Sequence, residues 1–134
     1  TWDEQLHMAD VRNLITKALN IEVAAFFIIF ISSTYLLIRK KTKLLLKSLK
    51  SASFIGLILT LLIVIASFFN FNYLFLKFHL FSVNNDLWQL SAQSNLIKLF
   101  PQYFFQDFLV RLIVQSAGIF LVLFSTTTYL LKKK

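Results

Sequence analysis

Residues 52–69 read ASFIGLILTLLIVIASFF, a run without one charged side chain. Two similar runs flank it: residues 21–38 contain a single charge, Glu22, and residues 108–131 contain only Arg111. A helix needs about 17–25 mostly apolar residues to cross the hydrocarbon core of a bilayer. A chain of 134 residues is too short to bury three such helices inside a water-soluble domain. The sequence therefore predicts an all-α integral membrane protein, a single membrane domain with three transmembrane helices.

The overall composition agrees with a membrane protein and excludes several other classes. Hydrophobic residues make up 57% of the chain and charged residues 15%, against about 25% charged residues in soluble domains. The absence of cysteine excludes a disulfide framework, a thiol nucleophile and a cysteine-ligated metal site. The net charge of +8 would suggest nucleic-acid binding in a soluble protein, but here the positive residues have a different distribution.

The basic residues gather beside the ends of the apolar runs. Residues 39–51 contain several lysines and one arginine without any acid, and the chain ends in Lys132, Lys133 and Lys134. Because positively charged loops stay on the cytoplasmic side, we predict a cytoplasmic loop at residues 39–51 and a cytoplasmic C-terminus. Basic residues at these places contact anionic lipid, so membrane lipid, and not nucleic acid, is the expected partner.

Residues 1–20 are predicted to lie on the outer side as an amphipathic helix in the membrane interface. Thr1 and Glu4 have the spacing of a capping box. Apolar residues recur at helical spacing and form one stripe: Met8, Val11, Ile15 and Leu19. An outward segment needs an upstream helix to carry it across the membrane, so we expect a missing fourth transmembrane helix and a longer natural chain.

Residues 70–107 are predicted to form an aromatic cap on the same outer side. Phe, Tyr and Trp are frequent in this stretch, which is too polar to span a bilayer and too apolar to extend freely into water. We expect short interfacial helices, a turn at residues 84–86 and another near Pro101. The aromatic side chains anchor the cap in the interface, and some of them are candidates to line a groove for acyl chains.

The chain has two histidines, His7 and His79, and both fall on the predicted outer side. Histidine is the side chain best suited to proton transfer near neutral pH, so the pair is the leading candidate for a catalytic site. Asp3 and Asp10 share a helix face with His7 and are candidates to orient it. No motif marks a serine nucleophile, a zinc protease, a Walker loop or a dinucleotide-binding turn.

Two other functions, and two roles for Arg111, remain open at this point. A metal-dependent hydrolase on the outer face would use both histidines with Glu4 or Asp10, although their spacing carries no signal for a metal site. A non-catalytic membrane partner subunit would need no site. Arg111 follows Asp107 by four residues, so it either forms an ion pair at the membrane edge or faces a polar cavity and meets an ester carbonyl.

Two groups of residues centred on the histidines form a recognisable pattern. The first is EQLHMADV at residues 4–11, and the second runs from FHLFS at 78–82 through NDLW at 85–88, LI at 96–97 and FP at 100–101 to FF at 104–105. Their content and order around two apolar runs resemble Lit, the bacterial lipoprotein intramolecular transacylases. After Trp88 the sequence reads QLSAQSN, where many relatives have an acidic stretch with proline, so carboxylates in that stretch are not expected to act here.

The resemblance implies an enzyme of the bacterial cell membrane with its active site on the extracytoplasmic face. It implies that the sn-2 acyl chain of a diacylglyceryl lipoprotein moves to the α-amine of the N-terminal cysteine, which leaves an N-acyl lyso lipoprotein. No metal or cofactor is implied. The catalytic residues would be His7 and His79, one as the base and the other as an oxyanion or leaving-group partner, and the sequence does not assign the two roles. The supporting residues would be Glu4, Asp10, Asn85, Trp88 and Arg111.

Overall fold

The computed structural model describes residues 1–133 and contains four α-helices. They are α1 (Trp2–Ile38), α2 (Thr42–Ser82), α3 (Asn95–Leu99) and α4 (Gln102–Lys132). Helices α1, α2 and α4 are long and apolar enough to cross a membrane, which confirms the predicted all-α class with three such helices. Lys134, the last of the terminal lysines in the sequence prediction, lies outside the described residues.

Helix α1 is continuous where the sequence suggested two segments, residues 1–20 and 21–38. Its first turn has the expected capping box. The Thr1 hydroxyl accepts a hydrogen bond from the Glu4 backbone N–H, and the Glu4 carboxylate accepts one from the Thr1 backbone nitrogen. No glycine or proline occurs between Trp2 and Ile38, so nothing interrupts the helical hydrogen bonds near residue 20. The helix ends just before Lys40, whose φ of 55° reverses the chain.

Helix α2 begins at Thr42, so the loop expected at 39–51 is confined to residues 39–41. The sequence TKLLLKSLK at its start consists largely of leucine and lysine, which are good helix formers. The helix bends at Asn70, which has non-helical φ and ψ of −162° and 86°. The Asn70 side chain accepts a hydrogen bond from the Tyr73 backbone at 2.9 Å, which restarts the helix as a cap would.

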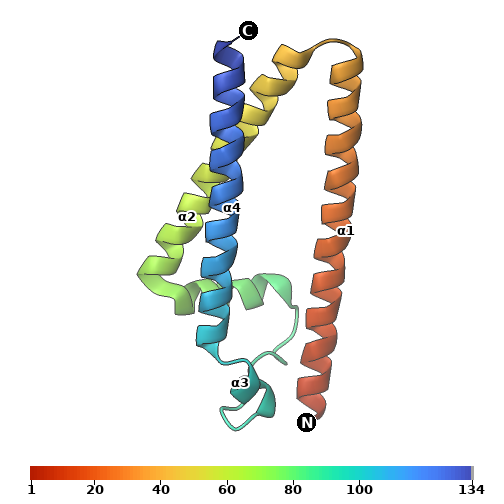
Figure 1. Ribbon diagram of the computed structural model, residues 1–134. Coiled ribbons are helices and arrows are strands. Elements are labelled where there is room, and N and C mark those ends of the chain that lie inside the picture. The colour runs from red at the N-terminus through yellow and green to blue at the C-terminus, as the bar shows by residue number, and fades with distance from the viewer. Residues whose placement is uncertain (134) are drawn as a thin grey trace.

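The part of α2 after the bend, residues 71–82, is called the arm. Figure 1 shows the arm running across the lower part of α4 toward α1, nearly perpendicular to the long helices. Phe75 of the arm lies 5.3 Å from Phe105 of α4 between ring centroids, and Gln102 donates a hydrogen bond to Asn72. These contacts fix the arm across the end of the bundle.

The segment between the arm and α4 contains the predicted breaks. Residues 84–86 form a bend, the short helix α3 follows at Asn95–Leu99, and Pro101 precedes α4. Helix α4 begins at Gln102, six residues before the apolar run at 108–131. Residues 102–107 contain neither glycine nor proline, so the helix can start directly after Pro101.

Helices α2 and α4 pack closely through small and polar residues. A methyl group added at Gly56 would lie 2.5 Å from the ring of Phe120, so the glycine permits the close approach. Ser53 and Thr60, one helical turn to either side, are buried on the same face of α2, and each hydroxyl donates to the carbonyl four residues earlier. Helix α1 touches α2 much less.

Most large apolar side chains on the long helices face outward. Phe27 is 54% exposed, Ile63 is 44% exposed and Val122 is 65% exposed. An apolar surface of this extent would be unfavourable in water and is compatible with lipid, so the chain is compatible with a multi-pass membrane protein. The turn at 39–41 and the C-terminal end of α4 lie at one end of the bundle, and the N-terminus, the arm and α3 lie at the other (Figure 1).

Candidate active site

His7 lies near the beginning of α1 and is 9% exposed. Its Nδ1 atom is buried and has no hydrogen-bond partner among residues 1–133. Burial lowers the pKa of His7 below its ordinary value of 6.5, the neighbouring His79 lowers it further, and Asp10 opposes both effects. His7 is therefore a neutral imidazole at neutral pH, with one nitrogen available to a ligand.

His79 lies in the arm of α2 and its orientation is fixed by the backbone. Its Nδ1 is 2.8 Å from the carbonyl oxygen of Phe75, one helical turn earlier. Since a carbonyl oxygen only accepts, Nδ1 carries the proton of the neutral ring, and Nε2 has the free lone pair. This is the tautomer that a general base requires when Nε2 faces the substrate.

The arm brings the two histidines together although they are far apart in sequence. Their ring centroids are 6.2 Å apart, and the ring planes differ by 26°. Both imidazoles are therefore close enough to contact one small group. The juxtaposition follows from the bend at Asn70, because a straight α2 would carry His79 away from α1 (Figure 1).

Three aromatic rings enclose His79. Trp88, from the segment after the arm, lies against it with ring centroids 5.1 Å apart and a plane angle of 32°. Phe75 and Phe78 approach it edge-on at 4.4 Å and 5.6 Å. The indole Nε1 of Trp88 is buried and, like His7 Nδ1, has no hydrogen-bond partner in the described part of the chain. The site thus combines a low-polarity wall with two unpaired nitrogens.

Asp10 and Asn85 connect α1 to the segment that carries Trp88. The Asn85 amide donates to Asp10 Oδ2 at 2.9 Å, and its carbonyl oxygen accepts from the Leu87 backbone at 2.9 Å. The sequence suggested that Asp10 orients His7, but its hydrogen bond goes to Asn85, and it acts on His7 only through its charge. Asn85 is the residue that holds the segment in place.

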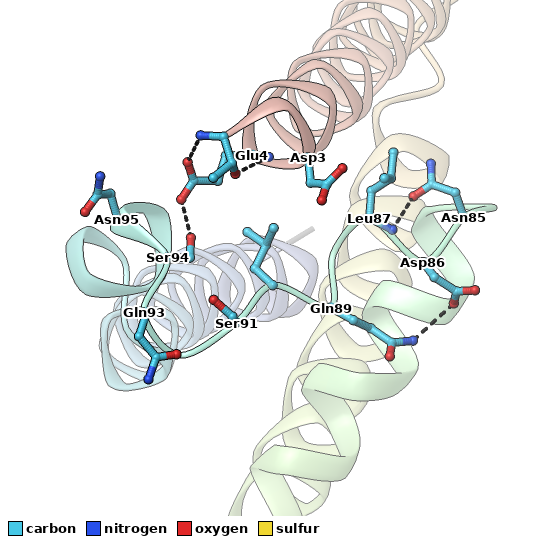
Figure 2. Close-up of a pocket in the computed structure, with 12 residues that line it drawn as sticks. Asp3, Glu4, Asn85, Asp86, Leu87, Gln89, Ser91, Gln93, Ser94 and Asn95 are labelled. Atoms are coloured by element: carbon cyan, nitrogen blue, oxygen red, sulfur yellow. Dashed lines mark hydrogen bonds and ion pairs between the residues drawn. The ribbon is translucent and has the colours of Figure 1, made fainter.

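Glu4 makes a second connection, between α1 and α3. Its carboxylate accepts a hydrogen bond from the hydroxyl of Ser94 (Figure 2) and another from the Leu96 backbone. Both hydrogen bonds favour the ionised form of the carboxylate. Glu4 is therefore an ionised acceptor that holds the beginning of α3, and it makes no hydrogen bond to either histidine.

An open pocket of about 900 Å³, lined mostly by polar residues, lies between the beginning of α1 and the segment after the arm. Glu4 and Asp3 line it from α1, and residues of the segment 85–95 line the rest (Figure 2). Neither histidine lines this pocket, but Glu4 is one helical turn from His7, and Leu87 and Gln89 flank Trp88. The pocket therefore lies at the end of the molecule that carries the N-terminus.

The comparison with known families gives a match over this whole region. The sequence matches the family described as lipoprotein intramolecular transacylase Lit over residues 1–105, which include both histidines and the segment between the arm and α4. The chain belongs to the Lit family. Comparisons with curated proteins and with solved structures give no match. At the level of the family, Lit is described as a transacylase whose substrate is a lipoprotein.

Arg111 is the one proposed Lit supporting residue that lies outside the matched range. It is exposed on α4, and within residues 1–133 no ion pair or hydrogen bond joins it to Asp107 or to the histidine site. The expected ion pair between these two residues is therefore not formed, since both side chains extend into the surroundings of α4.

The described residues contain no group of three His, Asp or Glu side chains arranged to hold a metal ion. Glu4 and Asp10, the acids named for that alternative, bind Ser94 and Asn85 instead. The Lit site also contains residues that sequence reasoning did not select. Phe75 and Phe78 enclose His79, and Ser94 holds Glu4. Only Phe75 could have been found from the sequence, because it precedes His79 by four residues and so lies on the same helix face.

Proposed function

We propose that this Lit protein transfers the sn-2 acyl chain of a diacylglyceryl lipoprotein to the α-amine of its N-terminal cysteine. The observation that carries the proposal is the pairing of His7 with His79 at 6.2 Å between ring centroids. The amine nitrogen attacks the sn-2 carbonyl carbon, the new N–C bond forms, and the C–O bond to glycerol breaks. The proton lost by the amine ends on the glyceryl oxygen, so the products are an amide and an alcohol.

His79 is the base in this mechanism. Its Nδ1–H is held by the Phe75 carbonyl, so Nε2 can take the proton of the attacking amine and then deliver it to the leaving oxygen. His7, kept neutral by burial, donates an N–H hydrogen bond to the developing oxyanion, a role for which a neutral imidazole is suited. Histidine acid–base catalysis of this kind contributes about 10²–10⁴-fold.

The transfer needs no nucleophile from the enzyme. Attack closes a ring of about eight atoms within one substrate molecule, which is feasible when both reacting groups are held in place. Among the described residues neither histidine is hydrogen-bonded to a serine, and the Ser94 hydroxyl is occupied by Glu4. These contacts favour direct transfer over an acyl-enzyme.

We place the site at the extracytoplasmic surface of the membrane, where a bacterial lipoprotein has its lipid and its peptide. The basic residues at the opposite end of the bundle support this orientation. The arm and α3 then lie in the interface as interfacial helices. Removing a two-tailed lipid from the bilayer costs about 0.8 kcal/mol per CH₂, so the substrate enters sideways from the membrane. A fourth, upstream transmembrane helix belongs to the same proposal.

A crossover experiment tests the proposal. Two synthetic diacylglyceryl lipopeptides are mixed, one with a deuterated sn-2 chain and one with a ¹³C-labelled peptide, and the products are analysed by mass spectrometry. We expect each product to keep its own acyl chain on its own amine. A product that combines the deuterated chain with the labelled peptide, or a trapped acyl-enzyme, would contradict the intramolecular mechanism.

A further inference from the structure

Trp88 contains a buried hydrogen-bond donor without an acceptor, directly beside the proposed base. Its Nε1 is buried and unpaired within residues 1–133, while its ring lies 5.1 Å from the ring of His79. A buried N–H without an acceptor is unfavourable, and an unpaired group of this kind in a native protein calls for an explanation such as a ligand or a catalytic role. Indole is a donor only, so its partner must be an acceptor.

The orientation of the two rings explains why His79 does not satisfy this donor. The indole N–H bond lies in the plane of its ring, and this plane is tilted by only 32° from the plane of His79. The hydrogen therefore points past the histidine ring and not into its face. An acceptor for this donor would lie about 2.9 Å from Nε1, near the plane of an indole ring that lies against His79.

The segment that carries Trp88 is held firmly enough to aim this donor. Asn85 ties the segment to Asp10 of α1 and to the Leu87 backbone, and Gln89 donates to Asp86 at 3.1 Å. Leu87 and Gln89 are the direct neighbours of Trp88, so the backbone on both sides of the indole is restrained. A donor fixed before the reaction needs no reorganisation when charge develops near it.

We infer that the Trp88 indole N–H donates a hydrogen bond to the carbonyl oxygen of the substrate's sn-2 ester and to the oxyanion formed from it. The inference rests on the proposed acyl transfer. An ester under attack by an amine presents one strong acceptor, the carbonyl oxygen, which becomes an anion as the N–C bond forms. The other unpaired nitrogen is His7 Nδ1, in a ring whose centroid lies 6.2 Å from that of His79. His7 and Trp88 thus each bring an unpaired nitrogen next to the proposed base.

A substitution that removes the N–H and keeps the ring tests this role. Replacing Trp88 by benzothienylalanine exchanges the N–H for sulfur and preserves the bicyclic ring that stacks on His79. We expect kcat to fall by about 10²–10³-fold, the usual effect of losing one oxyanion donor, with KM and thermal stability nearly unchanged. Trp88→Phe should lose at least as much activity. The matched control is Trp2→Phe, since Trp2 is 71% exposed and contacts neither histidine.

A spectroscopic measurement separates this inference from the proposed function. Trp2 and Trp88 are the only tryptophans, so protein labelled with ¹⁵N-tryptophan gives two indole signals. A diacylglyceryl lipopeptide with an acetylated amine keeps the ester but cannot react. Its binding should move the Trp88 indole proton downfield and leave that of Trp2 in place. A shift without acyl transfer from the unblocked lipopeptide would support the donor and refute the proposed function.

Two results would overturn the role of Trp88. One is a benzothienylalanine variant whose kcat stays within about 2-fold of the wild type, because the indole N–H then contributes nothing to the transition state. The other is an unchanged Trp88 indole signal in protein saturated with the blocked lipopeptide. Either result would leave the indole as a wall of the site that only positions His79.

Discussion

Asn85 donates a hydrogen bond to Asp10 at 2.9 Å and thereby joins the segment after the arm to the helix that carries His7. The two residues are not neighbours in sequence, and this contact closes a loop that contains the whole of α2. His7 lies on the helix of Asp10, Trp88 lies on the segment of Asn85, and the ring of His79 is close to both. The relative positions of the three rings therefore depend on this connection as well as on the bend at Asn70.

Removing this connection should lower activity more than stability. We expect Asp10→Ala and Asn85→Ala each to reduce kcat by about 10-fold, equivalent to about 1.4 kcal/mol, because the Trp88 segment becomes less well positioned. The double variant should be no worse than either single variant, since both remove the same hydrogen bond. A double-mutant cycle on kcat measures the coupling, with Asp107→Asn on α4 as the control. Fully additive losses would show that the two residues act independently.

Substitutions at the two histidines should separate a donor from a base. His79→Gln should lower kcat by about 10²–10⁴-fold, because glutamine cannot accept and release a proton. His7→Ala should also be strongly impaired, whereas His7→Asn should recover part of the activity, because its amide N–H can stand near the position of Nδ1. Single-turnover assays with the diacylglyceryl lipopeptide measure these rates. If His7→Asn is as inactive as His7→Ala, His7 acts by proton transfer and the assigned roles are wrong.

The buried neutral state of His7 should make the fold sensitive to acid. The pKa of His7 is lowered in the folded protein, so the unfolded chain binds a proton at a higher pH than the folded chain does. The free energy of unfolding is therefore unaffected by His7 above about pH 6.5 and decreases as the pH falls below that value toward the lowered pKa. Thermal unfolding in detergent should show a larger loss of Tm between about pH 7.5 and pH 5 for the wild type than for His7→Leu.

Titration of the carboxylates contributes to the acid sensitivity of both proteins and cancels in this comparison. Asp10→Asn should enlarge the loss, because the charge that raises the pKa of His7 is removed. Equal losses of Tm in the wild type and His7→Leu would mean that His7 is not protected from protonation by burial.

The two glycines should respond in opposite ways to substitution by alanine. A methyl group at Gly56 would lie 2.5 Å from the Phe120 ring, so Gly56→Ala should destabilise the contact between α2 and α4 by about 1–3 kcal/mol. Gly118→Ala meets nothing within 4 Å and should be neutral or stabilising by up to about 1 kcal/mol. Unfolding in mixed detergent measures both. Adding Phe120→Leu to Gly56→Ala should restore stability, and a failure to do so would place the strain elsewhere.

The sequence by itself determined the number of long helices and the breaks between them. The apolar runs at 21–38, 52–69 and 108–131 exceed what a short chain can bury, and their length sets the class of fold. The end of the apolar run at residue 69 coincides with the bend at Asn70, and Pro101 marks a helix start because its effect on the backbone is local. The ends of the helices were less predictable. Residues 1–20 and 42–51 contain neither glycine nor proline, so each segment simply extends the transmembrane helix next to it.

The candidate site was predictable only in part. Both histidines stood out in the sequence as the only ones in the chain, and topology assigned them to one side of the membrane. That the indole of Trp88 lies on His79, that Asp10 binds Asn85 rather than His7, and that Glu4 holds α3 were decided by the tertiary structure. These contacts join residues far apart in the chain, and their geometry depends on how the bent α2 crosses the bundle, which no local pattern of residues encodes.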